Sequence, residues 1–567
     1  MLSGTIPYPP TSRVLSIAEL VTVICHCSTD PTLASLACVN RSFKDAALPV
    51  LWYKQEGLVP LAHCFGCLVE EKLRPGQKDT PHPNPSSTID MRGYNRKRIL
   101  KMIKQSSEEE WKRVFHYAKM IRCLKRARKL TQVIDESVLY AMFSFADGLF
   151  LPNIHHLEWP LSDGQPDVSM YLSNFVTPSL KHIEMCEPFR ATKVAMDSLR
   201  VCRCLKKVDI GAVTHTGALI PLRQILLQSP QLNYFTFAFS IEPSHLNILG
   251  SMNDLRELHI DLSKPYDWSR LLPATSMFPV LNKLGLQFEN VRQGADFLDA
   301  VFLPCVETVR FHFKDRTFPQ PTMVERFADS IATHFSKDTL RSIFISSRCP
   351  SRSPWNTNNA IQPPFLTPFL SLPNVYNFTI EANWCYDLDN EFLRTIAVAW
   401  PQLSSLTIDP SASWPPSADC RITLHSLLPF VEHCPNINSI SCHIEGIAPS
   451  AYERGGPTDI DDYRQRIRTD ALDTISVGDS RVTDIENAAV FISKLCPYLG
   501  MIYAWEDLWF GDDESSSHSD DWNSVQCWAK RLAVIRHQER KRVHEEYCDG
   551  DTSSESACDD DISSHSD

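Results

Sequence analysis

One apolar phrase recurs along most of this chain and constrains its fold more than any other feature. It is a proline, any residue, and then apolar residues spaced L-x-x-L-x-L, and its first copy spans residues 152–159. Alternate positions of a strand face the same side, so each copy predicts a strand with one buried face. Further copies begin at Pro178, Pro230, Pro279, Pro304, Pro373, Pro401, Pro435 and Pro497, and copies without the proline begin at Leu205, Leu255 and Leu340.

The spacing of the copies indicates a repeat. The first apolar residues of the early copies fall at 154, 180, 205, 232, 255, 281 and 306. These are intervals of about 23 to 27 residues, within the range of a leucine-rich repeat. Proline lacks an N–H and disfavours helix at the residue before it, so it ends one helix and begins the next strand. Later intervals are longer and predict loops.

Between the copies the apolar residues take a helical period. Helices are predicted over residues 216–229, 322–336, 390–400 and 423–434. A repeated strand, turn and helix predicts an α/β leucine-rich-repeat solenoid over residues 131–510, with a curved parallel sheet inside and helices outside. Most copies lack the asparagine or cysteine that usually follows the strand, so the repeats are degenerate. The alternative is an ordinary α/β domain, in which strands also alternate with helices.

Bulk composition narrows the class of protein. The chain has 567 residues, a formal net charge of -12 and 43% hydrophobic residues. This charge argues against general nucleic-acid binding, and no apolar run reaches the roughly 20 residues that a membrane helix needs. Residues 1–10 lack a basic segment followed by an apolar core, so we expect no signal peptide. The 19 cysteines show no framework spacing, which indicates a reducing cytoplasm, nucleus or both.

An N-terminal module over residues 13–62 is predicted to form three short helices, after a disordered segment over residues 1–12. Asp30 and Pro31 have the residue types of an N-cap and a first helical position. Fifty residues of this kind bury a marginal core, so we expect a partner to complete it. The apolar residues that define the three helices are Ile17, Leu20, Val21, Ile24, Leu33, Leu36, Ala37, Val39, Phe43, Leu48, Leu51 and Trp52.

Residues 14–20, residues 33–43 and the pair Leu51-Trp52 together resemble an F-box. The order of parts, with the F-box first and the repeats after it, is similar to that of the F-box/leucine-rich-repeat proteins abundant in fungi. Ala18 stands where the family usually has proline, and Phe43 stands where it usually has tryptophan.

The resemblance implies that the N-terminal helices bind the Skp-type adaptor of an SCF ubiquitin ligase and, through it, the cullin core. The alternative is a self-contained helical cap on the solenoid. The adaptor-binding residues implied by the resemblance are Leu15, Ile17, Leu20, Ile24, Leu33, Leu36, Val39, Phe43, Leu51 and Trp52, of which Leu36, Val39, Leu51 and Trp52 are the expected anchors.

Residues 63–106 are expected to be an irregular linker, and residues 107–130 a basic capping helix. Ser107 and Glu110 have the spacing of a capping box, and apolar residues follow at helical spacing from Trp111 to Leu124. A helix that covers the open end of the solenoid is the favoured interpretation, and a patch for nucleic acid or an acidic partner is the alternative. His63, Cys64 and Cys67 have zinc-like local spacing, but a structural zinc site needs a second ligand pair, so no metal is expected.

The strand pattern also predicts which side chains point away from the core. They form a polar face, which solenoids use to bind partners. The candidate target-binding residues are Glu257, His259, Asp261, Lys283, Gln287, Arg310 and His312. Other outward positions are Gly285, Thr308, Asn377, Thr379, Glu381, Ser405, Thr407 and Asp409. For any single residue, a plain solvated position remains the alternative.

No catalytic motif or cofactor pattern is present in the sequence. Asp387 and Asp389 suggest a calcium loop, but Phe392 occupies the place of its glycine. Residues 511–547 predict an acidic loop and a C-terminal helix with a stripe of Trp522, Val525, Trp528, Leu532 and Ile535. Residues 548–567 predict a disordered acidic tail, which we expect to pair transiently with the basic residues between Arg92 and Lys129.

These features together predict an interaction protein rather than an enzyme. The leading hypothesis is a substrate receptor, in which the N-terminal helices bind the ligase adaptor and the solenoid binds a target protein. A scaffold that never engages a ligase is the second hypothesis, and a factor that binds RNA or DNA through the basic helix is the third. No membrane partner is expected.

Overall fold

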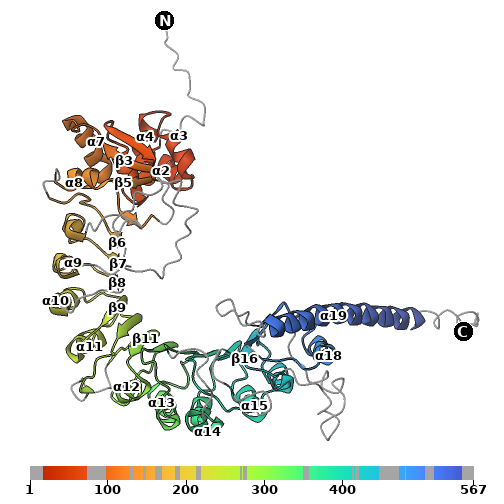
Figure 1. Cartoon of the computed structure of the whole chain (residues 1–567). Coiled ribbons are helices and arrows are strands. Elements are labelled where there is room, and N and C mark those ends of the chain that lie inside the picture. The colour runs from red at the N-terminus through yellow and green to blue at the C-terminus, as the bar shows by residue number, and fades with distance from the viewer. Residues whose placement is uncertain are drawn as a thin grey trace, which may run out of the picture. The chain divides into compact units, whose positions relative to one another are not determined.

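The computed structural model describes residues 17–72, 98–127, 132–144, 148–159, 169–185, 192–211, 219–268, 271, 277–348, 357–410, 414, 421–445, 471–478, 480–504 and 516–551. The chain divides into two compact units (Figure 1). Unit 1 contains the residues up to Leu262 and a few between Arg270 and Leu281, and unit 2 contains the rest. The predictions for residues 1–12, Leu15 and residues 552–567 lie outside the described residues.

Three helices open unit 1, as the sequence predicts: α2 (Ala18–His26), α3 (Asp30–Leu36) and α4 (Arg41–Tyr53). Pro31 lies in the first turn of α3, where its missing N–H costs nothing. Asn40 caps α4, because its side chain accepts a hydrogen bond from Phe43 N at 2.9 Å. The helices share a small core of Val21, Cys25, Leu33, Phe43 and Ala47.

The region expected to be a linker instead contains two strands. β2 (Leu68–Lys72) pairs antiparallel with β3 (Arg98–Met102), and β3 pairs parallel with β5 (Gln132–Ile134). Three helices outside that region pack beside these strands or each other: α8 (Glu136–Ser144) contacts β3, and α5 (Val59–Ala62) contacts β5 and α7 (Glu108–Ala118). Isolated strands that pair only with each other carry no repeat signal, which is why the sequence pattern did not reveal them.

Helix α7 begins as predicted but ends earlier. Ser107 and Glu110 form the predicted capping box, and Glu110 Oε1 also accepts a hydrogen bond from Gly66 N at 2.7 Å. The helix stops at Ala118, and Leu124 lies in strand β4 (Cys123–Lys125) instead. The expected basic helix over residues 107–130 is therefore a shorter helix followed by a strand.

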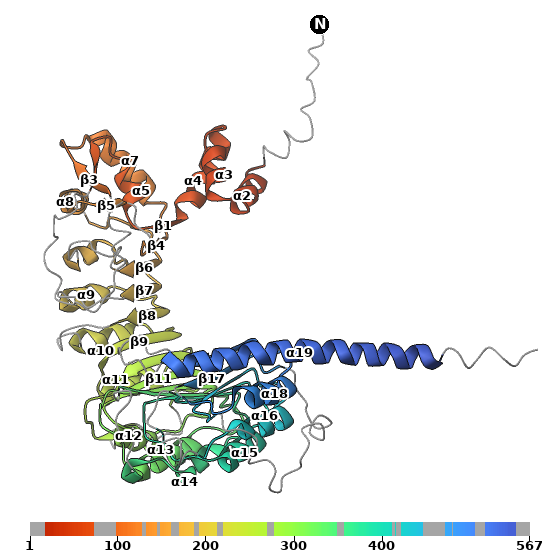
Figure 2. The same ribbon diagram turned by 45° about the vertical axis from the view of Figure 1, so that its right-hand side comes forward.

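The remaining strands of unit 1 are parallel and lie in chain order. The order is β1-β4-β6-β7-β8-β9-β10, where β1 is Lys54–Glu56, β6 His156–Trp159, β7 His182–Met185, β8 Lys207–Ile210, β9 Tyr234–Ser240 and β10 Glu257–Asp261. The helical elements between the strands are η1 (Ser169–Asn174), α9 (Thr192–Leu199), α10 (Leu219–Gln228) and α11 (Pro243–Gly250). Both views show α9 and α10 on one side of these strands (Figures 1 and 2).

Unit 2 repeats this arrangement. Its strands follow the order β11 to β18: β11 Lys283–Phe288, β12 Thr308–Phe313, β13 Ser342–Ser347, β14 Asn377–Glu381, β15 Ser405–Ile408, β16 Ser439–Cys442, β17 Thr474–Gly478 and β18 Met501–Ala504. The α-helices are α12 (Val291–Leu298), α13 (Pro321–His334), α14 (Pro363–Leu366), α15 (Asn390–Ala399), α16 (Leu428–His433), α18 (Ile485–Leu495) and α19 (Ser516–Asp551). The 3-10 helices are η5 (Thr357–Asn359), η6 (Thr367–Ser371) and η7 (Leu424–Leu427).

The fold is therefore α/β, with fifteen parallel strands in chain order among the described residues and helices between them. Each of the twelve predicted apolar copies corresponds to a strand. The apolar positions pair in register from one strand to the next, as in the buried row Leu284, Val309, Ile343, Phe378, Leu406, Ile440, Ile475 and Ile502.

A backbone hydrogen-bond motif recurs just before the strands. The carbonyl oxygen of one residue accepts from two consecutive N–H groups of the following repeat. His155 O accepts from Lys181 N at 2.9 Å and His182 N at 2.9 Å, and Arg341 O accepts from Tyr376 N at 2.7 Å and Asn377 N at 3.1 Å. The same double acceptor recurs at Lys181, Lys206, Asn233, Asn282, Glu307, Tyr376, Ser404, Asn438 and Asp473. This carbonyl ladder shows that successive copies share backbone geometry as well as apolar spacing.

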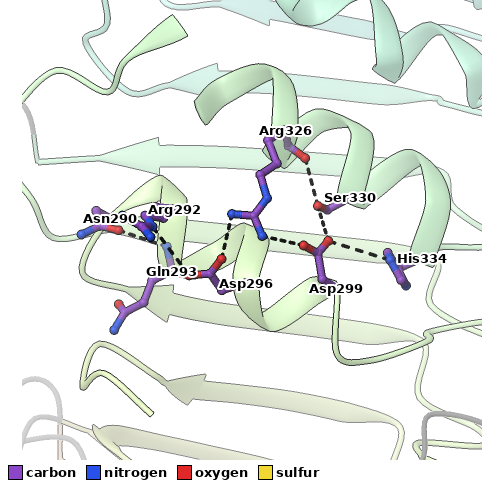
Figure 3. Close-up of polar contacts among 8 residues, drawn as sticks. All are labelled: Asn290, Arg292, Gln293, Asp296, Asp299, Arg326, Ser330 and His334. Atoms are coloured by element: carbon purple, nitrogen blue, oxygen red, sulfur yellow. Dashed lines mark hydrogen bonds and ion pairs between the residues drawn. The ribbon is translucent and has the colours of Figure 1, made fainter. Parts of the chain in front are cut away.

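Helices α12 and α13 of unit 2 are joined by a polar clamp (Figure 3). Arg326 of α13 lies between two carboxylates of the preceding repeat, 2.8 Å from Asp296 Oδ1 and 2.7 Å from Asp299 Oδ2. Ser330 Oγ donates to Asp299 Oδ1 at 2.7 Å. Asn290 caps α12 by accepting from Gln293 N at 3.0 Å.

Helix α19 covers the last strand, β18. Trp522, Val525 and Ala529 are buried, and Gln526 Oε1 accepts a hydrogen bond from Ile502 N at 2.5 Å. The helix thereby satisfies part of the open edge of β18. The predicted stripe is only partly buried, since Trp528 and Ile535 are exposed. The helix also continues to Asp551, past the predicted start of the acidic tail at residue 548.

Candidate protein-interaction surfaces

The N-terminal helices expose more apolar surface than their small core hides. Ile17, Leu20, Val23 and Ile24 lie on α2 or at its N-cap, and their exposed fractions are 45%, 40%, 58% and 38%. Val39, after α3, is 63% exposed. We call these five residues the exposed helical patch. Several exposed apolar side chains gathered on one short helix, as on α2, typically mark a contact surface.

The residues expected to bind an adaptor divide into three groups. Ile17, Leu20, Ile24 and Val39 are exposed and available to a partner, whereas Leu33 and Phe43 are buried in the helical core. Leu36 and Leu51 are half-buried and pack against that core. Leu33 and Phe43 are therefore corrected from contact residues to core residues. Val23 was missed, because it lies outside the i, i+3, i+4, i+7 pattern used to identify the apolar face.

Trp52, one of the four expected anchors, already has a partner within the chain. Its ring stacks on Tyr117 of α7, with centroids 4.5 Å apart. Trp52 is half-buried, so only part of its surface remains for another protein.

A continuous polar ladder runs across the strands of unit 1. The paired residues His156, His182, Lys207, Tyr234 and Glu257 form one row, and Glu158, Glu184, Asp209, Thr236 and His259 form the next. Each row advances one strand, about 4.8 Å, at a time. We call these ten residues the unit 1 polar ladder.

Contacts link neighbouring members of this ladder. Lys207 Nζ lies 3.6 Å from Glu184 Oε2 and 4.5 Å from the centre of the Tyr234 ring. Tyr234 Oη donates to Asp209 Oδ2 at 3.2 Å, and His259 Nε2 lies 3.0 Å from Glu257 Oε1. The side chains are therefore held in defined positions before any partner arrives, which lowers the entropy cost of binding.

Partial burial shifts the pKa values of several residues in the ladder. Burial lowers the pKa of His156 and of His182, and the positive charges of His156 and Lys207 lower that of His182 further. Burial and the neighbouring Glu184 raise the pKa of Asp209. Burial also raises the pKa of Tyr234 to about 12. His156 and His182 therefore stay neutral near pH 7, and the rows combine them with Lys207 and with acidic side chains such as Glu158 and Glu184.

At one end of the ladder, Glu158 collects several donors. Lys125 Nζ and His156 Nε2 each lie 3.4 Å from Glu158 Oε1, and Arg126 N donates to Oε2 at 3.0 Å. Burial raises the pKa of Glu158, but these donors outweigh burial and leave the pKa below its usual value.

Two outward predictions are wrong at strand ends. Asp261 is 4% exposed, and the strand register shifts between Ile260 and Asp261, so alternation fails there. Asp409 is 1% exposed and has a φ of 32°. Its carboxylate accepts hydrogen bonds from Ala382 N and Asn383 N, so it stabilises the turn after β14. Gly285 is also buried, while Glu257 and His259 are half-buried members of the ladder.

The other four predicted target-binding residues belong to unit 2. Lys283 and Arg310 are exposed, and Gln287 and His312 are half-buried. Arg310 packs over the Phe344 ring, with its Cζ 4.8 Å from the ring centre, and His312 Nδ1 lies 3.0 Å from Ser346 Oγ.

Further along unit 2 the same face is lined by small polar side chains without charge. The paired residues are Ser342, Asn377, Ser405, Ser439 and Thr474 in one row, and Thr379, Thr407, Ser441 and Ser476 in the next. The sequence reasoning named only Asn377, Thr379, Ser405 and Thr407 among them. The alternation around Ile440 and Ile475 could have identified the others.

The residues outside these surfaces that the sequence analysis considered as metal ligands make contacts within the fold. Asp389 caps α15 by accepting from Phe392 N at 2.9 Å, and Asp387 Oδ1 pairs with Arg421 Nη2 at 2.8 Å. His63 Nε2 lies 3.0 Å from Gln132 Oε1. Within the described ranges, no three His, Cys, Asp or Glu side chains cluster so as to hold a metal ion. None of the helices that the structure describes is long and apolar enough to cross a membrane.

Comparison with known proteins finds no protein-family model and no curated protein that matches this chain.

Proposed function

We propose that this chain is the substrate receptor of an SCF-type ubiquitin ligase. In this proposal the N-terminal helices are an F-box-like domain that binds a Skp-type adaptor, and the strands and helices that follow are a degenerate leucine-rich-repeat solenoid that binds a target protein. Ubiquitin transfer would then be carried out by partners, in the cytoplasm, the nucleus or both.

The exposed helical patch is the observation that carries the adaptor proposal. Its five apolar side chains face solvent on a module with a core of only five buried residues. Burying such side chains in a partner contributes about 25 cal/mol for each Å² removed from water, which favours a partner with an apolar surface over a charged one.

The solenoid part of the proposal is supported by repetition. The apolar phrase, the register of the strands and the carbonyl ladder recur together. The unit 1 polar ladder offers fixed donors and acceptors to a target, and a rigid set of such groups favours specificity.

Three of the described basic residues favour a protein partner over nucleic acid, because each pairs with an acid. Arg98 pairs with Glu70 at 2.6 Å, Lys101 with Glu71 at 2.7 Å and Lys112 with Glu108 at 2.8 Å. Acidic neighbours at these positions would oppose the phosphate contacts that dominate nucleic-acid binding.

A scaffold function remains the second candidate, and the stacking of Trp52 on Tyr117 favours it. That contact joins the N-terminal helices to α7, which is what we expect if these helices are a cap on the solenoid.

The test is co-purification of the full chain with a Skp-type adaptor. We expect a complex with the natural chain and none with the double variant Leu20→Glu and Val23→Glu, because two carboxylates would be buried unpaired. The matched control is Val398→Glu, since Val398 is equally apolar and is 57% exposed on α15. If the natural chain is folded and forms no complex, the scaffold function replaces the receptor function.

A further inference from the structure

An open groove of about 320 Å³ lies between the C-terminal end of α18 and the middle of α19. Part of its lining is apolar, from Pro497, Tyr498, Ala533 and Val534. Tyr498 and Val534 are largely exposed, although both are large apolar side chains. The groove therefore offers an apolar surface that this part of unit 2 leaves in contact with solvent.

The rest of the groove is basic. Arg536, His537 and Arg540 contribute to its lining, and no Asp or Glu does so among the described residues. Arg536 is held in place because its Nη1 donates to Ser493 Oγ of α18. Lys530, Arg531, Lys541 and Arg542 add positive charge to the same helix, where Glu539 is the only acid between residues 530 and 542. A ligand of this groove should combine negative charge with one apolar side chain.

We propose that the groove binds the chain's own C-terminal segment, the sequence Asp559-Asp560-Asp561-Ile562. This replaces the expected pairing of the tail with the basic residues between Arg92 and Lys129, of which Arg98, Lys101 and Lys112 already pair with glutamates. Residues 552–567 contain no Lys or Arg, and their acids are Glu555, Asp559, Asp560, Asp561 and Asp567. Ile562 is the only large aliphatic residue among them, and it follows three consecutive aspartates. The segment thus matches both halves of the groove, the aspartates with Arg540 and His537, and the isoleucine with Tyr498 and Val534.

The length of the chain allows this contact. The helix from His537 to Asp551 is about 21 Å long, at about 1.5 Å per residue. Residues 552–559, if extended, span about 26 Å, at about 3.3 Å per residue. The segment can therefore turn back and place its aspartates beside His537. Because it is tethered, its effective concentration at the groove is about millimolar, so a weak contact suffices for occupancy.

Binding of a labelled peptide tests this proposal. The peptide has the sequence of residues 552–567, and it is titrated with the full chain and with a chain that ends at Asp551, which keeps every described element. We expect the shorter chain to bind the peptide at least tenfold more tightly, because the full chain carries a competing copy. We also expect the affinity to fall as salt is added, since the contact is largely ionic.

Variants of the shorter chain locate the contact. Arg540→Glu changes a lining residue, and Lys530→Glu makes the same charge change on the same helix outside the groove. We expect Arg540→Glu to weaken peptide binding at least tenfold and Lys530→Glu to change it less than twofold, with both variants keeping the natural far-ultraviolet circular dichroism. A peptide with Ile562→Ser should also bind at least fivefold more weakly.

Three results would overturn the proposal. The first is no measurable binding of the peptide to the shorter chain. The second is equal affinity for both chain lengths, which would mean that the tail does not occupy the groove. The third is equal weakening by Arg540→Glu and Lys530→Glu, which would mean diffuse attraction to the basic helix.

Discussion

Trp52 at the end of α4 and Tyr117 of α7 stack face to face, with ring centroids 4.5 Å apart and an interplanar angle of 15°. Backbone contacts lie beside this pair, since Arg122 N donates to Tyr53 O at 2.9 Å and Gly57 N donates to Lys125 O at 2.9 Å. Side-chain and backbone contacts together therefore join the N-terminal helices to the first strands of unit 1.

Removing the Trp52 ring should loosen this junction. A stacked aromatic pair contributes about 0.5–1.5 kcal/mol beyond its buried area. We expect Trp52→Ala to speed amide hydrogen exchange in α4 and β1 about two- to tenfold, while Trp52→Phe keeps a ring and has a smaller effect. Exchange that is unchanged in Trp52→Ala would show that the backbone contacts alone hold the junction.

The clamp of Asp299 on Arg326 and Ser330 should make unit 2 sensitive to acid. Burial raises the pKa of Asp299, but the hydrogen bonds from Ser330 and Arg326 outweigh it and hold the pKa below its usual value. The carboxylate therefore stabilises the folded state above the unfolded pKa of about 3.9, and this contribution is lost as the pH falls through the folded pKa. Since the pair is partly exposed, we expect Asp299→Asn to cost about 0.5–1 kcal/mol at pH 7.

Thermal unfolding of the two chains between pH 7 and pH 3 checks this prediction. The difference in midpoint between natural chain and Asp299→Asn should shrink toward the acid end of the range. Glu325→Gln, on the helix α13 that carries Arg326 and Ser330, serves as the control for a general change of charge. If the difference in thermal midpoint stays constant with pH, the destabilisation by Asp299→Asn comes from packing and not from the charge of Asp299.

Gly478 at the end of β17 should not tolerate a side chain. Its φ is 66°, and a Cβ atom there would come within 2.0 Å of Pro410 O. Left-handed backbone costs an L residue about 1–2 kcal/mol, and the collision with a carbonyl adds to that cost.

The matched control is Gly148→Ala, because Gly148 has a φ of 110° but nothing within 4 Å of the added Cβ. We expect Gly478→Ala to lower the thermal midpoint more than Gly148→Ala, and to increase proteolysis near β17 and β18. Equal falls in the thermal midpoint would mean that backbone strain, without the collision with Pro410 O, accounts for the destabilisation of both variants.

His425 should act as a stability switch in mild acid. Burial lowers its pKa to about 4, and its ring stacks on Phe491 with centroids 5.9 Å apart. The unfolded chain, with a His pKa of about 6.5, binds the proton more readily than the folded chain, so stability falls as the pH drops below about 6.5. The loss is complete near pH 4, and because the ring is only partly buried we expect it to be about 1–2 kcal/mol.

His425→Phe keeps a flat ring against Phe491 and removes the titrating group. We expect the variant to lose less stability than the natural chain between pH 7 and pH 4.5, as measured by urea unfolding. Parallel pH profiles for the two chains would contradict the assignment to His425.

The sequence predicts the strands well because their signal is redundant. Spacing, proline and apolar alternation agree at Leu180, Ile183 and Met185, and all three are buried, the last two in β7. β17 was missed although Leu472, Ile475 and Val477 have the same spacing, and the copies recognised at Leu205, Leu255 and Leu340 lack the proline too, so the pattern could have identified it. At β4 the residues Ile121 and Leu124 fit a helix and a repeat equally, so the short strand could not be distinguished from the end of α7.

The candidate surfaces were harder to predict than the strands. Alternation places Glu257 and His259 correctly, but it fails at Asp261 and Asp409, where a register shift and a left-handed residue end the strand geometry. The burial of Leu33 and Phe43 depends on how three helices pack, which a helical period alone does not specify. The groove beside α19 brings Tyr498 close to residues more than thirty positions away, and no local pattern records such a contact.

The backbone hydrogen bonds of the carbonyl ladder keep the same geometry although the repeats differ in length. The donors to His155 O come from the nearby Lys181 and His182, whereas those to Arg341 O come after a much longer excursion, at Tyr376 and Asn377, yet the bonds have similar lengths. Segments of different length can thus lie between strands that keep the same backbone contacts. Such tolerance would let surface loops diverge one repeat at a time, while the strands that carry them stay the same.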